Sequence, residues 1–97
     1  MPTYVTLWNY TQDGIETIEE SPDRLDDAVE LVESMGGELI DFYLTMGQYD
    51  IVAVTEFPDD ETCAQAALKI AQTGTVSSET LRAFPEDEYR DLIENLP

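Results

Sequence analysis

The chain has 97 residues, enough for one domain, and its 22 acidic residues against four basic ones give a formal charge of −18. Such a surface repels nucleic acids and anionic lipids, because both are polyanions, so neither class is an expected partner. The single cysteine excludes an internal disulfide, the lack of histidine excludes imidazole catalysis, and no apolar run is long enough to cross a membrane.

The acidic residues are spread along the chain instead of forming a tail. Their mutual repulsion would strain the fold in dilute buffer, whereas at molar salt the Debye length falls to about 3 Å and screens it. This favours a halophilic protein; the alternative is an acidic protein that recruits basic partners or cations. The first residues lack the basic region of a signal peptide, so we expect a cytoplasmic protein.

The first half of the chain predicts a strand followed by helices. A β-branched and aromatic run predicts the strand at 3–10, and a short helical piece follows between Gly14 and Ser21. The sequence Ser-Pro-Asp at 21–23 supplies an N-cap, a proline and a first-turn acid for a longer helix, which ends at the glycine pair 36–37. Apolar residues recur along one face of that helix: Leu25, Ala28, Val29, Val32 and Met35.

The second half predicts a hairpin, a helix, a strand and a terminal helix. The hairpin strands are expected at 38–46 and 49–57, and the last strand at 76–84. A helix lies between Pro58 and Gly74, and the terminal helix follows Pro85. We expect four residues of the former to face the sheet: Ala64, Ala67, Leu68 and Ala71. This order predicts one α+β domain over 1–97, a ferredoxin-like βαββαβ fold with an antiparallel four-stranded sheet and an extra C-terminal helix.

The hairpin predicts which side chains share a face of the sheet. Gly47 and Gln48 are expected to form a two-residue type II′ turn, because glycine suits the positive φ of its first central position. This register pairs Leu44 with Ile51 and divides the side chains between two faces. The helix-facing set is expected to be Val5, Leu7, Ile40, Phe42, Leu44, Met46, Tyr49, Ile51, Ala53, Leu81 and Ala83. The opposite, amphipathic face is expected to gather Tyr4, Thr6, Trp8, Tyr10, Tyr43, Asp50, Thr80 and Arg82.

An amphipathic sheet face needs a cover, because exposed aromatic surface of this extent is a liability. A second copy of the same sheet is the simplest cover, since most small oligomers are symmetric dimers. The sequence therefore predicts a homodimer formed through this face.

Three stretches carry a resemblance to a known family: YVTLWNYTQDGI, FYLTMGQYDIVAV and ETLRAF. Together they resemble the GYD-domain family over nearly the whole chain, and the G-x-Y-D element is Gly47-Gln48-Tyr49-Asp50. The resemblance implies a small ferredoxin-like protein that forms a dimeric α/β barrel, without an established activity, here in a halophilic version. A shorter stretch is similar to the effector-binding domain of leucine-responsive-type transcription regulators. That similarity implies a stand-alone effector-binding module.

The candidate ligand-binding residues are Trp8, Tyr43, Asp50 and Arg82. Asp50 either faces a ligand or accepts hydrogen bonds from the hairpin. Arg82 either pairs with Asp50, Asp41 or Glu56, or clamps the carboxylate or phosphate of a small anionic metabolite.

Two classes of function remain open from the sequence. The preferred one is a non-catalytic small-molecule-binding or interaction module, with no cofactor and no metal. The alternative is a cofactor-independent enzyme, isomerase or oxygenase-like, that uses Asp50, Tyr43 and Arg82 in the barrel. Cys63 is expected to be a quiet, partly buried thiol, because the acidic residues 59–61 oppose its ionisation.

Overall fold

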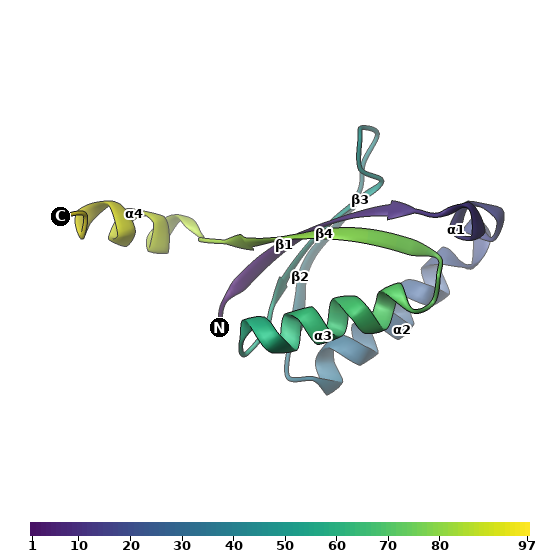
Figure 1. The fold of residues 1–97 in the computed structure, drawn as a ribbon, viewed down its shortest axis with the longest axis horizontal. Coiled ribbons are helices and arrows are strands. Elements are labelled where there is room, and N and C mark those ends of the chain that lie inside the picture. Colours follow the sequence, from purple (N-terminus) through teal and green to yellow (C-terminus); the bar gives the residue numbers. More distant parts are fainter.

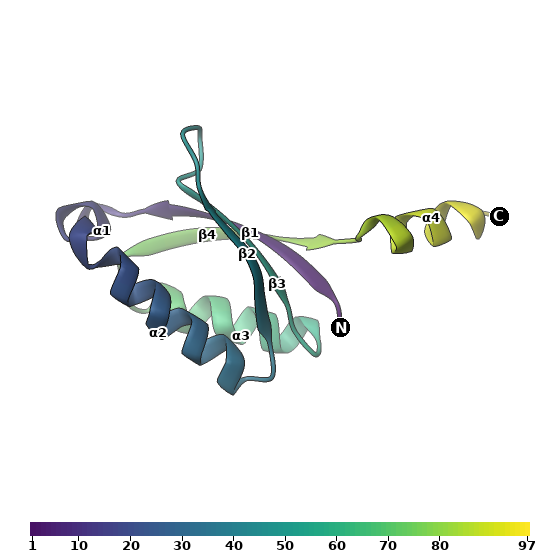
Figure 2. The same ribbon diagram turned by 180° about the vertical axis from the view of Figure 1, so that it is seen from behind.

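In the computed structural model, which describes residues 1–97, a four-stranded sheet carries two long helices on one face (Figures 1 and 2). The elements in chain order are β1 (Thr3–Tyr10), α1 (Gln12–Glu16), the 3₁₀ turn η1 (Ile18–Glu20), α2 (Ser21–Ser34), β2 (Glu38–Leu44), β3 (Ile51–Glu56), α3 (Asp60–Ala71), β4 (Val76–Ala83) and α4 (Glu86–Glu94). The strand order is β2-β3-β1-β4, and every neighbouring pair is antiparallel. The predicted ferredoxin-like α+β fold is confirmed.

Helix ends follow the local chemistry of the sequence. The carboxylate of Asp59 caps α3 by accepting a 2.8 Å hydrogen bond from the backbone N–H of Thr62. Gly36 ends the turn after α2 with a φ of +81°, which glycine adopts without strain. At the start of α2 the prediction was off by one residue: Ser21 is the first helical residue, and Glu20 is the cap, without a side-chain hydrogen bond.

The faces of β1 and β4 are opposite to the prediction. Tyr4 and Thr6 are buried against the helix layer, whereas Val5 lies on the open face. Residues paired across antiparallel strands share a face, so Arg82, opposite Tyr4, is also on the helix side, and Leu81 is 44 % exposed. Both alternating sets are partly apolar, so pattern alone allows either to be buried. On the buried face, Tyr4 packs edge-on against Phe57, and its hydroxyl reaches Asp60 at the start of α3.

The hairpin differs from the predicted type II′ turn. The pairing of Leu44 with Ile51 is confirmed, but the strands end there and a wider loop covers 45–50. Only Gly36 and Gly74 have a positive φ, so Gly47 does not occupy the predicted turn position. The threonine at the start of the loop closes it instead, since Thr45 Oγ1 donates a 2.5 Å hydrogen bond to the carbonyl of Tyr49.

A bulge in β2 changes the expected alternation of its side chains. The register shifts between Leu39 and Asp41, which places Leu39 opposite Thr55 on the helix side and leaves Ile40 42 % exposed. The prediction that Ile40 faces the helices was therefore wrong, whereas Phe42, Ile51 and Ala53 do lie on that side.

The inward face of α3 is one residue away from the predicted one. Cys63 and Ala66 are buried, whereas Leu68 is 69 % exposed, and the flanking Ala64 and Ala71 are exposed as well. Apolar residues of α3 lie on several sides of the helix, so the 3.6-residue period is compatible with more than one buried face. The buried cluster under the sheet consists of Tyr4, Val32, Phe57, Cys63 and Ala66.

Helix α4 projects from the end of β4 as an arm, away from both other long helices (Figures 1 and 2). The molecule is accordingly elongated, with extents of 51 × 30 × 17 Å. The apolar side chains of the arm are all at least half exposed: Phe84, Tyr89, Leu92, Ile93 and Leu96.

Candidate functional site

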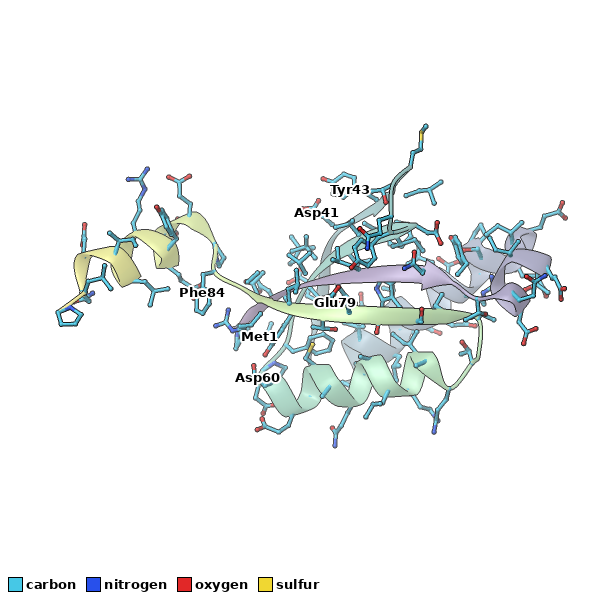
Figure 3. The ribbon with its side chains drawn as sticks, turned by 45° about the horizontal axis from the view of Figure 1, so that its top comes forward. Met1, Asp41, Tyr43, Asp60, Glu79 and Phe84 are labelled. Atoms are coloured by element: carbon cyan, nitrogen blue, oxygen red, sulfur yellow. The ribbon has the colours of Figure 1, made fainter.

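The four candidate site residues do not converge on one face of the sheet. Trp8 and Arg82 lie on the helix side, whereas Tyr43 lies on the open side and is 56 % exposed. Figure 3 shows Tyr43 on the hairpin, away from Asp60 and α3. The constellation needed for an enzyme that combines Asp50, Tyr43 and Arg82 is therefore not assembled within one chain.

Asp50 connects the hairpin to β1. Its Oδ2 accepts a 2.9 Å hydrogen bond from the backbone N–H of Tyr10, and its own N–H donates 2.9 Å to the carbonyl of Trp8. The carboxylate thus replaces a backbone carbonyl and extends the pairing of β3 with β1 by one step. Of the two interpretations of Asp50, this geometry agrees with the structural one, with Tyr10 as the partner in place of the hairpin's own residues.

Tyr49 provides a second connection from the same motif. Its hydroxyl donates a 2.6 Å hydrogen bond to Oε2 of Glu79 on β4, and this bond raises the pKa of the phenol above its usual value. The G-x-Y-D element therefore holds the hairpin loop to both β1 and β4.

Arg82 is already occupied by neighbours of its own chain. Its Nη1 donates to the carbonyl oxygens of Thr3, at 3.3 Å, and of Ala83. The guanidinium lies 4.5 Å from the ring centre of Phe84, and its nearest carboxylate is Glu88 at 4.0 Å. The predicted ion pairs with Asp41, Asp50 and Glu56 are not formed.

A partly buried polar contact joins β1 to the start of α3. The hydroxyl of Tyr4 donates to the carboxylate of Asp60, and burial together with this bond raises the pKa of Tyr4 well above its usual value. Burial, followed by the negative charge of Asp60, also raises the pKa of Cys63. The burial of Cys63 and its raised pKa agree with the prediction of a quiet thiol.

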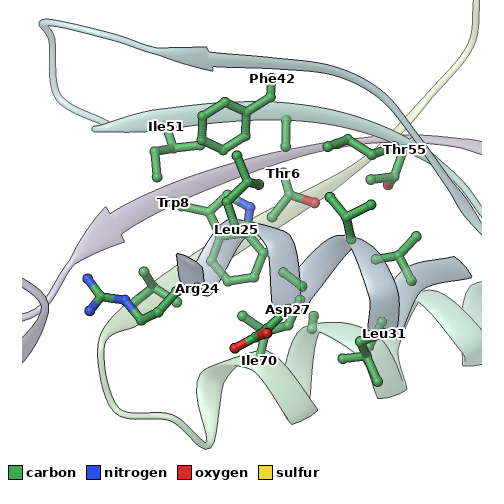
Figure 4. A pocket seen from close by; sticks show the side chains of 18 of the residues that line it. Thr6, Trp8, Arg24, Leu25, Asp27, Leu31, Phe42, Ile51, Thr55 and Ile70 are labelled. Atoms are coloured by element: carbon green, nitrogen blue, oxygen red, sulfur yellow. The ribbon is translucent and has the colours of Figure 1, made fainter. Parts of the chain in front are cut away.

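A cavity of about 360 Å³, which no motif in the sequence indicates, lies between the sheet and helices α2 and α3 (Figure 4). Its walls are mainly apolar, with Trp8, Phe42 and Ile51 from the sheet and Leu25 and Ile70 from the helices. The only available signal was the number of alanines in the facing elements, at 28, 53, 66 and 67, which leave room between the layers.

The family model of the GYD domain matches residues 4–93 of this chain. The chain belongs to the GYD domain family. The resemblance carried by the three sequence stretches is thereby confirmed. A relative from Thermus thermophilus, named glutamine synthetase and cystathionine beta-lyase binding protein, is 38 % identical over 97 residues, covering 99 % of each chain.

Solved structures share the fold of this GYD domain. A crystal structure of a Thermus thermophilus protein superposes with a TM-score of 0.56 at 23 % identity, covering 87 % of this chain and 94 % of the other. An Agrobacterium tumefaciens protein has a TM-score of 0.50 at 13 % identity, covering 88 % and 95 %. None of the helices combines the length and the apolar character needed to span a bilayer.

Proposed function

We propose that this GYD domain is a non-catalytic module that binds other proteins, enzymes among them, in the cytoplasm. The name of the Thermus relative supports this proposal, since that protein is described as binding two enzymes and aligns with this chain from end to end. The observation that carries it here is the projecting helix α4.

The apolar side chains of α4 have the spacing of a helix that docks into a groove. Tyr89, Leu92 and Ile93 stand at positions i, i+3 and i+4 of α4, Leu96 follows just after the helix ends, and each is more than half exposed. A monomeric surface rarely leaves such a row uncovered. Five acidic residues occupy other positions of the helix: Glu86, Asp87, Glu88, Asp91 and Glu94. The partner is accordingly a protein with an apolar groove and a basic rim.

The experiment measures binding to purified glutamine synthetase and cystathionine β-lyase from the same organism by calorimetry. The double variant Leu92→Asp, Ile93→Asp should reduce the affinity for a bound enzyme at least about a hundredfold, because two central anchors are lost. The matched variant Asp87→Asn removes one acidic charge at the edge of the helix and leaves the apolar row intact, so it should weaken binding by less than about fivefold, because exposed ion pairs contribute little. Failure to bind either enzyme, or equal affinity of the anchor variant, would contradict the proposal.

We further propose that the open sheet face joins two copies into a homodimer. The centre of that face is apolar and its border is acidic, with Val5, Leu7, Val52, Val54 and Leu81 between Asp41, Glu56 and Glu79. No helix of the same chain covers this side (Figure 2). Light scattering in molar KCl should give twice the chain mass of 10.9 kDa, and Val54→Lys should give the monomer. A wild type of 10.9 kDa would exclude the dimer.

A further inference from the structure

The cavity between the sheet and helices α2 and α3 is large for a domain of this size. Protein interiors normally contain few voids larger than a water molecule, whereas small-molecule sites enclose about 300–1,000 Å³. The volume of about 360 Å³ falls in the second range, and 17 of its 25 lining residues are hydrophobic. A ligand that fills it must have an apolar body.

The inner wall of the cavity holds a hydroxyl group without a partner. Thr55 is 8 % exposed, and its Oγ1 is buried with no hydrogen bond. Buried polar side-chain atoms nearly always have a partner, so an orphan in a cavity wall marks a position for a polar atom of a ligand. The other buried cavity threonine, Thr6, is 3.4 Å from the hydroxyl of Thr80 and is not such an orphan.

Two of the four cationic side chains of this acidic protein also line the cavity, Arg24 on α2 and Lys69 on α3. Neither forms a salt bridge, since the two salt bridges of the chain involve Arg82 and Arg90. The guanidinium of Arg24 donates to uncharged oxygens of Thr17 and Gly14, so no carboxylate neutralises its charge. One carboxylate, Asp27, lies on the same wall. In Figure 4, Arg24 lies at one end of the cavity and Thr55 toward the other.

We propose that this cavity binds a small organic anion with an apolar body, a carboxylate at one end and a hydrogen-bonding group at the other. The carboxylate is held by Arg24 and Lys69, the body lies along Trp8 and Ile51, and the far polar atom pairs with the hydroxyl of Thr55. The protein has a net charge of −18 and repels anions in general, but Arg24 and Lys69 can attract a carboxylate next to the apolar wall of the cavity. The site is independent of the proposed protein contacts, since α4 and the open sheet face do not line it.

The probes are 8-hydroxyoctanoate, octanoate and octan-1-ol, whose flexible chains adapt to the separation of the two ends. Trp8 is the only tryptophan of the chain and lines the cavity, so its fluorescence reports occupancy directly. We expect 8-hydroxyoctanoate to bind at least about tenfold more tightly than octan-1-ol, and octanoate to lie between them. Equal binding of the acid and the alcohol, or no change in emission with any probe at millimolar concentration, would overturn the proposal.

Separate variants test the two ends of the proposed site, the cationic end at Arg24 and Lys69 and the hydroxyl end at Thr55. The double variant Arg24→Gln, Lys69→Gln should lower the affinity for both carboxylates about tenfold or more and leave octan-1-ol unchanged. Arg90→Gln removes a cation from α4, outside the cavity, and is the control for nonspecific charge effects. Thr55→Val should abolish the advantage of 8-hydroxyoctanoate over octanoate. If the cation variant binds octanoate as the wild type does, or if the hydroxyl advantage survives Thr55→Val, the assignment of that end is wrong.

Discussion

Replacing Thr55 by valine should stabilise the ligand-free protein, because it removes a buried hydroxyl that has no hydrogen-bond partner. The two side chains have nearly the same shape, so the substitution neither opens nor fills space in the wall of the cavity. Thr55 also lies within β3, paired with Tyr4 and Leu39, where a β-branched valine suits the strand.

The magnitude follows from the cost of leaving a buried polar group unpaired, which is about 1–3 kcal/mol. In a domain of 97 residues, a change of about 1 kcal/mol corresponds to roughly 4–8 °C in the midpoint of thermal unfolding. Thr55→Val should therefore raise the midpoint by at least about 4 °C.

The assay is thermal unfolding followed by circular dichroism in one buffer, with Thr6→Val as the comparison. Thr6 is as deeply buried and lies on the same face of the sheet, but its hydroxyl has Thr80 as a neighbour. Thr6→Val should leave the midpoint unchanged or lower it, since a hydrogen bond is lost. If Thr55→Val melts at or below the wild-type temperature, the hydroxyl already has a partner and the reasoning about the cavity wall is refuted.

Four other perturbations test the fold. Asp50→Leu should destabilise by about 1–3 kcal/mol in urea unfolding, because the N–H of Tyr10 loses its acceptor, whereas Asp50→Asn should lose less. Gly14→Ala should prevent folding, since a Cβ there overlaps a backbone carbonyl, whereas Gly47→Ala, in open space, should melt like wild type. The pKa of Tyr4 is raised in the folded protein, so just above about pH 10 only the unfolded chain loses the phenolic proton. The free energy of unfolding should therefore fall as the pH rises past that point, and Tyr4→Phe should flatten the decline. The midpoint of melting should rise from dilute buffer to molar KCl, as screening removes repulsion among the acids; a flat profile would argue against salt adaptation.

The elements and their order could be predicted from local signals in the sequence. The first strand, the hairpin, the two long helices and the last strand lie within a few residues of their predicted positions, because caps, glycines and hydrophobic periods act over short stretches of chain. The antiparallel ferredoxin-like plan then follows from the order of elements. Of the two roles that the sequence allowed for Asp50, the structure agrees with the hydrogen-bond acceptor, although the donor is the N–H of Tyr10 on β1 and not a group of the hairpin.

The face of each strand that the helices cover depended on tertiary packing. In β1 one alternating set contains three aromatic residues and a threonine, and the other contains Val5 and Leu7 with two polar residues. Both sets are partly apolar and can be buried, so the pattern alone could not choose between them. Contacts between segments remote in sequence make the choice: the hydroxyl of Tyr4 reaches Asp60 on α3, and that of Tyr10 reaches Ser21 on α2. The same choice places Arg82 and Tyr43 on opposite faces of the sheet and puts Thr55, whose hydroxyl has no partner, in the wall of a cavity that no local signal reports.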